Sequence, residues 1–322
     1  MTLYEGKKSG AIDVELGVPQ GSVLGPLLFI IYINDIKEIM TDGKVNMFAD
    51  DTVIFIVAED FAGAYRKLQT ELNKVSDWLK LKKLMLNVKK TKYMVITNKR
   101  MEGNIQPLRL EEQEIERVES LKYLGVIVDD KLSFNDHVDY TIRKAARKLG
   151  VIYRINQLLD VETKIMLYKS IVASHFEYCP TVLFLANRRQ KRRMQRIQNK
   201  AMRLILGCTR TTPSATMRDW LHWMTVEERL TVRTLEFIFK LKNGLLPRYL
   251  AEIIQYGTDV HNHNTRTAMD LRLQNFRKAG TQNSLFYKGF QLFNRLPDEV
   301  KQANNLHSFK RLCVRCVKDR LI

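Results

Sequence analysis

Two adjacent aspartates, Asp50 and Asp51, lie between two short apolar segments, and this feature constrains the fold of the chain most strongly. Residues 44–48 and 52–58 have the length and the β-branched and aromatic content of strands, so the chain must reverse between them. Residues on both faces of these strands are apolar, which predicts that they lie centrally in a covered sheet. Turns between such strands usually contain glycine or asparagine. A turn that presents two carboxylates instead needs an explanation.

Two neighbouring carboxylates repel each other, and burying them is costly unless a cation or hydrogen bonds compensate. Aspartate is common in turns, so a purely structural turn remains an alternative. Carboxylates, however, are ligands that Mg²⁺ and Mn²⁺ prefer. Two such ions about 4 Å apart, held by aspartates, are a general device for phosphoryl transfer. We therefore expect Asp50 and Asp51 to be catalytic metal ligands.

Charge is distributed very unevenly along the chain. The 322 residues include 53 Lys and Arg against 35 Asp and Glu, a formal net charge of +18. Residues 1–160 are nearly neutral, whereas residues 161–322 carry 29 basic and 12 acidic residues. No acidic residue occurs between Glu177 and Asp219. The second half is therefore expected to bind a polyanion.

The most amphipathic segment of the chain, residues 188–206, is predicted to be a helix. Its apolar residues fall on one face, and eight Lys and Arg occur between Arg188 and Arg203. The residues expected to contact nucleic acid are Arg188, Arg189, Arg192, Arg193, Arg196 and Lys200. A solvated charged face is the alternative, but like charges on one helix face repel, and a polyanion relieves that repulsion. Such phosphate contacts position a nucleic acid without reading its sequence.

Several motifs occur in a fixed order along the chain. They read GVPQGSVLGPLLF from Gly17, YINDI from Tyr32, FADD from Phe48, LN from Leu86 with KT from Lys90, LKYLG from Leu121, NTR from Asn264 and FNRLP from Phe293. In this order they resemble the reverse transcriptases of non-LTR retrotransposons, of the LINE and jockey type. The resemblance covers essentially the whole chain.

The resemblance implies RNA-directed DNA polymerisation with Mg²⁺ or Mn²⁺, on an RNA template with a DNA primer and nucleoside triphosphates. It implies that Asp50 and Asp51 are catalytic residues and metal ligands. Gln20, Gly21 and Phe48 would belong to the substrate-binding pocket. Lys90 would contact the triphosphate or protonate the leaving pyrophosphate. Lys89 and Lys92 are alternatives to Lys90, and a solvated lysine cluster remains an equal possibility.

The fold class expected from the resemblance is α+β. Residues 1–130 would form a partial palm of antiparallel sheet and helices. Independently of the resemblance, the pattern of apolar residues predicts a largely buried helix over residues 27–40 and another from Phe61 to about Lys82. Residues 131–210 would form a helical thumb that contains the basic helix. Residues 211–322 would form a mostly helical C-terminal region. The LKYLG strand would grip the primer end.

Similar enzymes have a third aspartate on a palm strand well upstream of the Pro-Gln-Gly loop. Asp13 lies too close to that loop, and Asp35 falls within the helix that follows it. The chain is therefore expected to be an N-terminally truncated polymerase that is inactive alone. A non-catalytic nucleic-acid-binding protein derived from a degenerate element is the alternative.

Four cysteines do not indicate a disulfide framework. The spacing of Cys313 and Cys316 suits half of a zinc site, but two residues three apart also share one face of a helix, and we favour this buried face. The longest apolar run, residues 27–33, is too short to cross a membrane. We expect an intracellular protein without membrane contact, in either the nucleus or the cytoplasm, and of undetermined oligomeric state.

Overall fold

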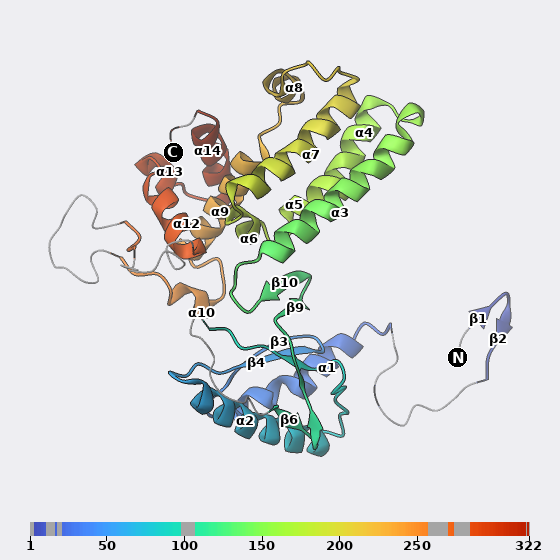
Figure 1. The fold of residues 1–322 in the computed structure, drawn as a ribbon, viewed down its shortest axis with the longest axis vertical. Coiled ribbons are helices and arrows are strands. Elements are labelled where there is room, and N and C mark those ends of the chain that lie inside the picture. Colours follow the sequence, from blue (N-terminus) through green and yellow to red (C-terminus); the bar gives the residue numbers. More distant parts are fainter. Residues whose placement is uncertain are drawn as a thin grey trace. The chain divides into compact units, whose positions relative to one another are not determined.

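The computed structural model describes residues 3–10, 17, 21–97, 107–256, 270–273, 284–319 and 321. It divides into two compact units, residues 1–121 and residues 122–322. Helices and strands occur in both units, in agreement with the predicted α+β class (Figure 1). The division of the chain into palm, thumb and C-terminal region stays a prediction.

The first unit combines small sheets with one long helix. Its strands are β1 (Leu3–Tyr4), β2 (Lys7–Lys8), β3 (Lys44–Phe48), β4 (Asp51–Phe55), β5 (Lys92–Tyr93), β6 (Arg109–Leu110), β7 (Gln113–Glu114) and β8 (Glu116–Arg117). Its helices are α1 (Gly25–Ile33), the 3₁₀ helix η1 (Asn34–Ile39) and α2 (Phe61–Leu81). β1–β2, β3–β4 and β6–β7 pair antiparallel, and β5 pairs with β8 in parallel. The predicted helix from Phe61 is confirmed.

The β3–β4 hairpin is less covered than the sequence predicts. Within the described residues it forms a two-stranded sheet and not the centre of a larger one. Val45, Met47 and Ile54 pack against a small core that includes Trp78 of α2. Phe48 and Phe55 remain exposed. The expectation of a sheet covered on both faces is therefore wrong for the described part of this unit, because α2 covers only one face.

The helix expected over residues 27–40 is also more exposed than predicted. It is divided into α1 and η1, and among their residues Gly25, Ile33 and Ile36 are buried. Pro26 stands in the first turn of α1, where a missing N–H costs no helical hydrogen bond. Ile31 is 64% exposed although its neighbours are also apolar. Hydropathy predicted burial here, but the described residues cover a single edge of the helix.

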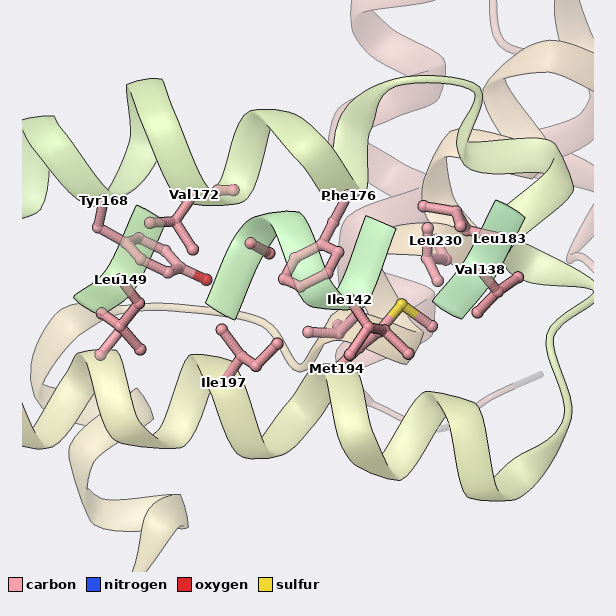
Figure 2. Packing of buried hydrophobic residues seen from close by; sticks show 14 of the residues in the cluster. Val138, Ile142, Leu149, Tyr168, Val172, Phe176, Leu183, Met194, Ile197 and Leu230 are labelled. Carbon is pink, nitrogen blue, oxygen red and sulfur yellow. The ribbon is translucent and has the colours of Figure 1, made fainter. Parts of the chain in front are cut away.

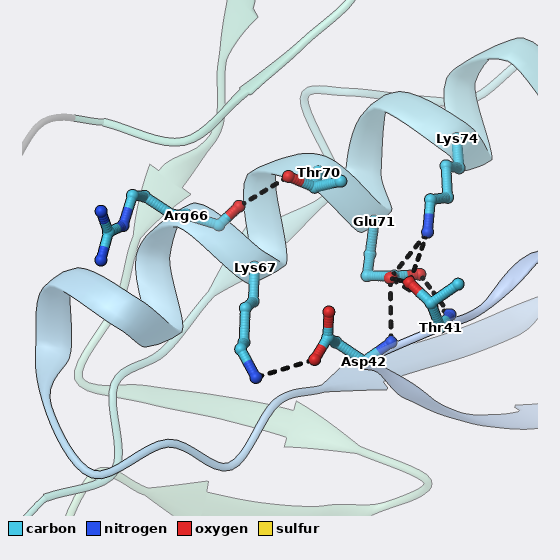
Figure 3. A network of polar contacts seen from close by, with 7 residues as sticks. All are labelled: Thr41, Asp42, Arg66, Lys67, Thr70, Glu71 and Lys74. Atoms are coloured by element: carbon cyan, nitrogen blue, oxygen red, sulfur yellow. Dashed lines mark hydrogen bonds and ion pairs between the residues drawn. The ribbon is translucent and has the colours of Figure 1, made fainter.

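A buried carboxylate joins α2 to the turn that precedes β3 (Figure 3). Glu71 has no exposed surface, and its side chain accepts hydrogen bonds from the Thr41 hydroxyl at 2.7 Å and from the Asp42 amide at 3.1 Å. The Lys74 ammonium lies 3.1 Å from the same carboxylate. Burial alone would raise the pKa of Glu71, but the hydrogen bonds outweigh it and lower this pKa from 4.5 to about 2. Glu71 thus fixes the start of the hairpin.

The second unit is a helical bundle preceded by a pair of strands. The strands are β9 (Ser120–Tyr123) and β10 (Val126–Asp129). The helices are α3 (Asn135–Arg154), η2 (Asn156–Leu158), α4 (Val161–Leu167), the π-helix η3 (Tyr168–Ala173), α5 (Ser174–Glu177), α6 (Pro180–Phe184), α7 (Arg188–Leu206), α8 (Ser214–Leu221), α9 (Val226–Lys242), α10 (Arg248–Ala251), α12 (Leu285–Asn294), α13 (Asp298–Lys301) and α14 (Leu306–Lys318). In the described residues, no helix is both long and apolar enough to span a membrane.

A continuous apolar core holds α3, η3, α5, α6, α7 and α9 together (Figure 2). Ile142 and Leu149 from α3 face Met194 and Ile197 from α7. Leu183 of α6 is fully buried in the same cluster. Burying each such side chain stabilises the fold by about 1.5–3 kcal/mol, so this core is the main source of stability in the unit.

A second core lies between α9, α12 and α14. Phe239 of α9 stacks on Phe309 of α14 with ring centroids 4.2 Å apart. Cys313 and Cys316 are buried on the same side of α14, and burial raises the pKa of Cys313 to about 12. Within the described residues, no three His, Cys, Asp or Glu side chains form a group that could hold a metal ion. The burial of both cysteines on one side of α14 agrees with the buried-face alternative.

Candidate catalytic hairpin and nucleic-acid interface

The turn between β3 and β4 places the two aspartates at the tip of the hairpin. Phe48 pairs with Asp51 across the ladder, so only Ala49 and Asp50 form the loop. Ala49 has φ of 53°, in the left-handed region. This conformation costs a residue with a Cβ roughly 1–2 kcal/mol. The tight reversal that the sequence predicts is confirmed, and it is made without glycine.

Both carboxylates are free to accept ligands. Asp50 and Asp51 are exposed, and no side-chain hydrogen bond or ion pair occupies them among the described residues. A divalent ion such as Mg²⁺ takes about six oxygen ligands, several of which are usually water or phosphate oxygens. Two adjacent carboxylates suit such an ion as part of its ligand set. They do not complete a site by themselves, since the described residues contain no cluster of three candidate ligands.

Of the predicted pocket residues, Gly21 and Phe48 are described, while Gln20 and the Asn264–Arg266 motif lie outside the described residues. Gly21 has φ of +82°, and a Cβ built there would meet no described atom within 4 Å. The backbone conformation, and not a lack of space, is therefore what favours glycine at this position. Phe48 is 64% exposed and is the ladder partner of Asp51. An aromatic surface thus adjoins the carboxylate pair.

Lys90 lies in a tight turn after α2. The Asn87 carbonyl accepts the Thr91 amide at 3.1 Å, and the Asn87 side chain accepts the Lys90 amide at 3.2 Å. The ammonium of Lys90 has no hydrogen bond or ion pair to Asp50 or Asp51 in the part of the chain that is described. Lys92, one of the alternatives, forms an ion pair with Glu116. Of the three lysines considered, Lys89 and Lys90 are exposed and have no ion pair to another described residue.

Asp35 is held in an ion pair. Its carboxylate lies 2.7 Å from the Lys82 ammonium, whose hydrogen bond is the largest cause that lowers the pKa of Asp35. The Lys82 carbonyl accepts a hydrogen bond from the Tyr32 hydroxyl at 2.7 Å, and the Lys82 ammonium lies over the Tyr32 ring. These contacts attach the C-terminal end of α2 to α1 and η1. Asp35 therefore has a structural role that does not require a metal.

Comparison with known proteins relates the chain to retrotransposon polymerases. Residues 2–128 match the family described as reverse transcriptase (RNA-dependent DNA polymerase). The N-terminal part of the chain belongs to the reverse transcriptase family. A probable RNA-directed DNA polymerase from transposon X-element of Drosophila melanogaster is 31% identical over 225 residues, which is 68% of this chain and 25% of that protein.

Two further relatives are also RNA-directed DNA polymerases by name. A probable RNA-directed DNA polymerase from transposon BS of Drosophila melanogaster is 29% identical, over 73% of this chain and 27% of that protein. The RNA-directed DNA polymerase from mobile element jockey of the same organism is 27% identical, over 63% of this chain and 23% of its own length. The chain thus spans about a quarter of the length of these relatives. No solved structure matches it significantly.

In the present chain, helix α7 has the bounds that the sequence predicts. The Asn187 side chain accepts the Gln190 amide, and the Gln190 side chain accepts the Asn187 amide, which is a complete capping box. Gly207 ends the helix with φ of 65°. Met194, Ala201 and neighbouring apolar residues form the buried face. Five of the eight basic residues between Arg188 and Arg203 are exposed on the solvent side of this helix, and the other three are partly buried.

The six predicted interface residues of α7 divide into two groups. Arg193 forms an ion pair with Asp139 of α3. The remaining five are exposed, and none has an ion pair to another described residue; they are Arg188, Arg189, Arg192, Arg196 and Lys200. Lys191, which the sequence interpretation left out, pairs with Glu227 at 3.0 Å. Arg193 and Lys191 thus help to join helices, while the five exposed residues leave a continuous cationic face.

The LKYLG motif, residues 121–125, comprises the end of β9 and the turn to β10. Leu124 and Gly125 have φ of 45° and 82°. The Tyr178 hydroxyl donates a hydrogen bond to the Leu124 carbonyl, and a Cβ at Gly125 would lie 3.1 Å from the Tyr178 ring. Sequence reasoning missed Tyr178, because a contact 54 residues away leaves no local pattern. The glycine at position 125 was the one local sign in this motif that another group approaches the turn closely.

Proposed function

We propose that the chain is part of an RNA-directed DNA polymerase in which Asp50 and Asp51 hold divalent metal ions for nucleotidyl transfer. The observation that carries this proposal is the two-residue turn that sets both carboxylates, exposed and without competing cations, at the tip of the β3–β4 hairpin. The reverse transcriptase match of residues 2–128 supports it. The RNA template, the DNA primer and the nucleoside triphosphates are part of the proposal.

In this mechanism the residues of the chain bind and orient. Asp50 and Asp51 would hold Mg²⁺ or Mn²⁺; such an ion, when bound, neutralises phosphate charge and lowers the pKa of a coordinated oxygen nucleophile. Gly21 lets the backbone approach a nucleotide closely, and Gln20 would supply a donor and an acceptor beside it. Phe48 would form an apolar wall next to Asp51. Lys90 would contact the triphosphate and hold a proton for the leaving pyrophosphate.

The five exposed basic residues of α7 would bind the phosphate backbone of the template–primer duplex. Their regular spacing on one helix face suits a line of phosphates and carries no sequence selectivity. In the three-part division that we propose, this helix belongs to the thumb. The affinity of this surface for nucleic acid should fall with salt, because each neutralised phosphate releases counterions.

Within the described residues, Asp50 and Asp51 form an incomplete ligand set, so we propose that a polypeptide of these 322 residues does not extend a primer by itself. The resemblance supports this proposal, because similar enzymes have a third aspartate on a strand upstream of the Pro-Gln-Gly loop. A second candidate function, nucleic-acid binding without catalysis, is favoured by the contrast between the partial metal site and the complete cationic face of α7. One experiment separates the two functions.

The experiment is primer extension on poly(rA)–oligo(dT) with Mg²⁺ or Mn²⁺. It compares the 322-residue polypeptide with a chimera in which the part of the X-element relative upstream of its match to this chain is joined to the N-terminus of the polypeptide. The chimera should extend the primer, and Asp50→Asn in the chimera should lower the rate by roughly 10³-fold or more, because the ligand charge is lost while the side-chain size is kept.

The matched control is Asp42→Asn, which removes a carboxylate from the same unit in a position paired with Lys67. It should leave extension nearly unchanged. An Asp50→Asn chimera as active as its parent would exclude the proposed metal ligand. A folded chimera that binds duplex without extending it would favour the binding-only function, and Asp50-dependent extension by the 322-residue polypeptide would disprove its proposed inactivity.

A further inference from the structure

Helix α3 carries a second cationic surface that the motifs do not include. Residues 140–159 contain five basic residues and no acidic residue. Four of the five, Lys144, Arg147, Lys148 and Arg154, line a shallow groove of about 580 Å³ together with Gly150 and Val151. We call these four residues the α3 stripe. All four are exposed, and none has an ion pair to another described residue.

The α3 stripe begins beside the β9–β10 turn. The Lys122 ammonium of β9 lies 3.4 Å from the Tyr140 hydroxyl and 5.5 Å from the centre of its ring. The Lys144 ammonium lies 4.9 Å from the centre of the same ring. Tyr140 is thus bracketed by one lysine from the hairpin and one from the stripe. Because Tyr178 fixes the Leu124–Gly125 turn, Lys122 is held at the start of the stripe.

We propose that the α3 stripe, extended by Lys122 and Tyr140, binds the phosphate backbone of a nucleic-acid duplex as an interface additional to α7. From Lys144 to Arg154 the helix rises about 15 Å, at 1.5 Å per residue. One strand of a duplex rises about 3.4 Å per nucleotide, so this length passes four or five phosphates. Four unpaired cations therefore match the charges they would meet. This inference rests on the proposed function, since it names a further contact of the same polymerase with its duplex.

The apolar face of α3 argues against a membrane as the partner. Val138, Ile142, Ala145, Leu149 and Ile152 are all buried in the core of the second unit. A helix that binds a lipid surface inserts its apolar face into the acyl boundary, and here that face is already used. Val151 is the partly exposed apolar residue in the groove. The available surface is cationic with one aromatic ring, which suits phosphates and a base or sugar.

The surroundings of the stripe also carry a positive potential. Burial is the largest cause that lowers the pKa of His175 on α5, and Lys144 and Lys148 lower it further. Nearby Asp139 does not neutralise the stripe, because it pairs with Arg193. Unpaired like charges on one helix face are unfavourable in isolation. Binding a polyanion would relieve this repulsion.

The test measures binding of the 322-residue polypeptide to a fluorescent RNA–DNA hybrid duplex between 50 and 300 mM NaCl, a range that resolves the salt slope. The triple variant Lys144→Ala, Arg147→Ala, Lys148→Ala should weaken binding and reduce the slope of log affinity against log salt by about 2–3. The charge-retaining variant Lys144→Arg, Arg147→Lys, Lys148→Arg should keep the parent slope. Thermal unfolding confirms that each variant is folded.

The matched control removes three exposed charges from α14 in the same unit, with Arg311→Ala, Arg315→Ala and Lys318→Ala. Its slope should equal that of the parent. An equal loss in the control would attribute the effect to net charge and overturn the proposal. So would a stripe variant with unchanged hybrid affinity that loses binding only to phosphatidylserine vesicles.

The same measurement on Arg188→Ala, Arg192→Ala, Arg196→Ala separates the two surfaces. If the α7 variant lowers the slope and the stripe variant does not, the α3 proposal fails and the proposed role of α7 stands. If only the stripe variant lowers the slope, the α3 proposal stands and the role of α7 fails. Neither result depends on Asp50 or Asp51, which primer extension tests.

Discussion

The two units of the chain are built in different ways. The second unit surrounds a continuous apolar core with long amphipathic helices, and its charges lie on the outside. The first unit has two small cores and strand pairs that join no larger sheet among the described residues. It also exposes apolar side chains on α1 and on the hairpin. The two proposed kinds of chemistry follow this division, with carboxylates in the first unit and cations in the second.

Stability and proposed catalysis therefore depend on different interactions. In the second unit the cationic faces are supported from behind by buried methyl and aromatic groups. In the first unit the position of the hairpin depends on a few polar contacts, above all those of Glu71. Polar contacts each contribute about 0.5–3 kcal/mol, whereas a core sums many burial terms. We therefore expect the first unit to open more readily than the second.

The largest expected effect is that of Leu183→Ala, which creates a cavity in the core of the second unit. Leu183 is fully buried, and such truncations cost about 2–5 kcal/mol in the free energy of unfolding. Hydrogen exchange followed by mass spectrometry, read separately for the peptides of each unit, should show the loss in residues 122–322 alone. An equal loss of protection in residues 1–121 would mean that the two units unfold together and do not differ in their source of stability.

An intermediate effect is expected for Glu71→Gln. The carboxylate accepts several hydrogen bonds in a buried position, and hydrogen bonds to a charged group contribute about 1.5–3 kcal/mol. Since the pKa of Glu71 is lowered to about 2 in the fold, its contribution is complete above pH 4.5 and is lost as the pH falls toward 2.

Hydrogen exchange of residues 61–81 at pH 7 and at lower pH checks this prediction. The parent should lose protection in α2 as the solution is acidified, while the Glu71→Gln variant should be less protected at pH 7 and should change less with pH. Glu59→Gln, at an exposed site in the same unit, is the control. If Glu71→Gln kept the pH dependence of the parent, another group would be responsible for it.

The smallest effect is expected for Ile31→Gln on the exposed side of α1. Ile31 is 64% exposed, and surface substitutions usually change the free energy of unfolding by less than about 0.5 kcal/mol. Ile33→Gln in the same helix is the matched control, because Ile33 is buried and should be costly to replace. Urea unfolding monitored by fluorescence compares them, in a Trp220→Phe, Trp223→Phe background that leaves Trp78 as the tryptophan observed. A large loss for Ile31→Gln would show that this face is covered in solution, which would sharpen the contrast between the units.

The sequence predicted those elements that depend on local signals. The helix over residues 188–206 has a cap at Asn187, a stop at Gly207 and a periodic apolar face, and all three signals are local. The hairpin around Ala49 and Asp50 follows from two short apolar segments with no room for a longer loop. The predicted burial of residues 27–40 was wrong, because hydropathy reports which surfaces avoid water and not which neighbours are present to cover them.

The residue types of the candidate site could be predicted from the sequence, but the long-range contacts that hold these residues in place could not. Asp50 and Asp51 stand out in sequence because charges rarely interrupt apolar strands. The contacts of Glu71 with Thr41 and of Tyr178 with Leu124 join residues 30 and 54 positions apart, and no local pattern reports them. The separation of ion-paired Arg193 from the exposed arginines of α7 likewise required the neighbouring helix. The α3 stripe does have a sequence signal, the absence of acidic residues over residues 140–159. The interpretation of the sequence followed the motifs and did not use this signal.

The left-handed backbone of Ala49 restricts which amino acids can occupy the bend of the hairpin. Glycine would adopt this geometry at little cost, and asparagine or aspartate would tolerate it, whereas valine and isoleucine would be strongly disfavoured. Alanine is thus a compromise that keeps the chain stiff where glycine would let it flex. The orientation of the neighbouring carboxylates therefore depends on a residue that has no functional group of its own.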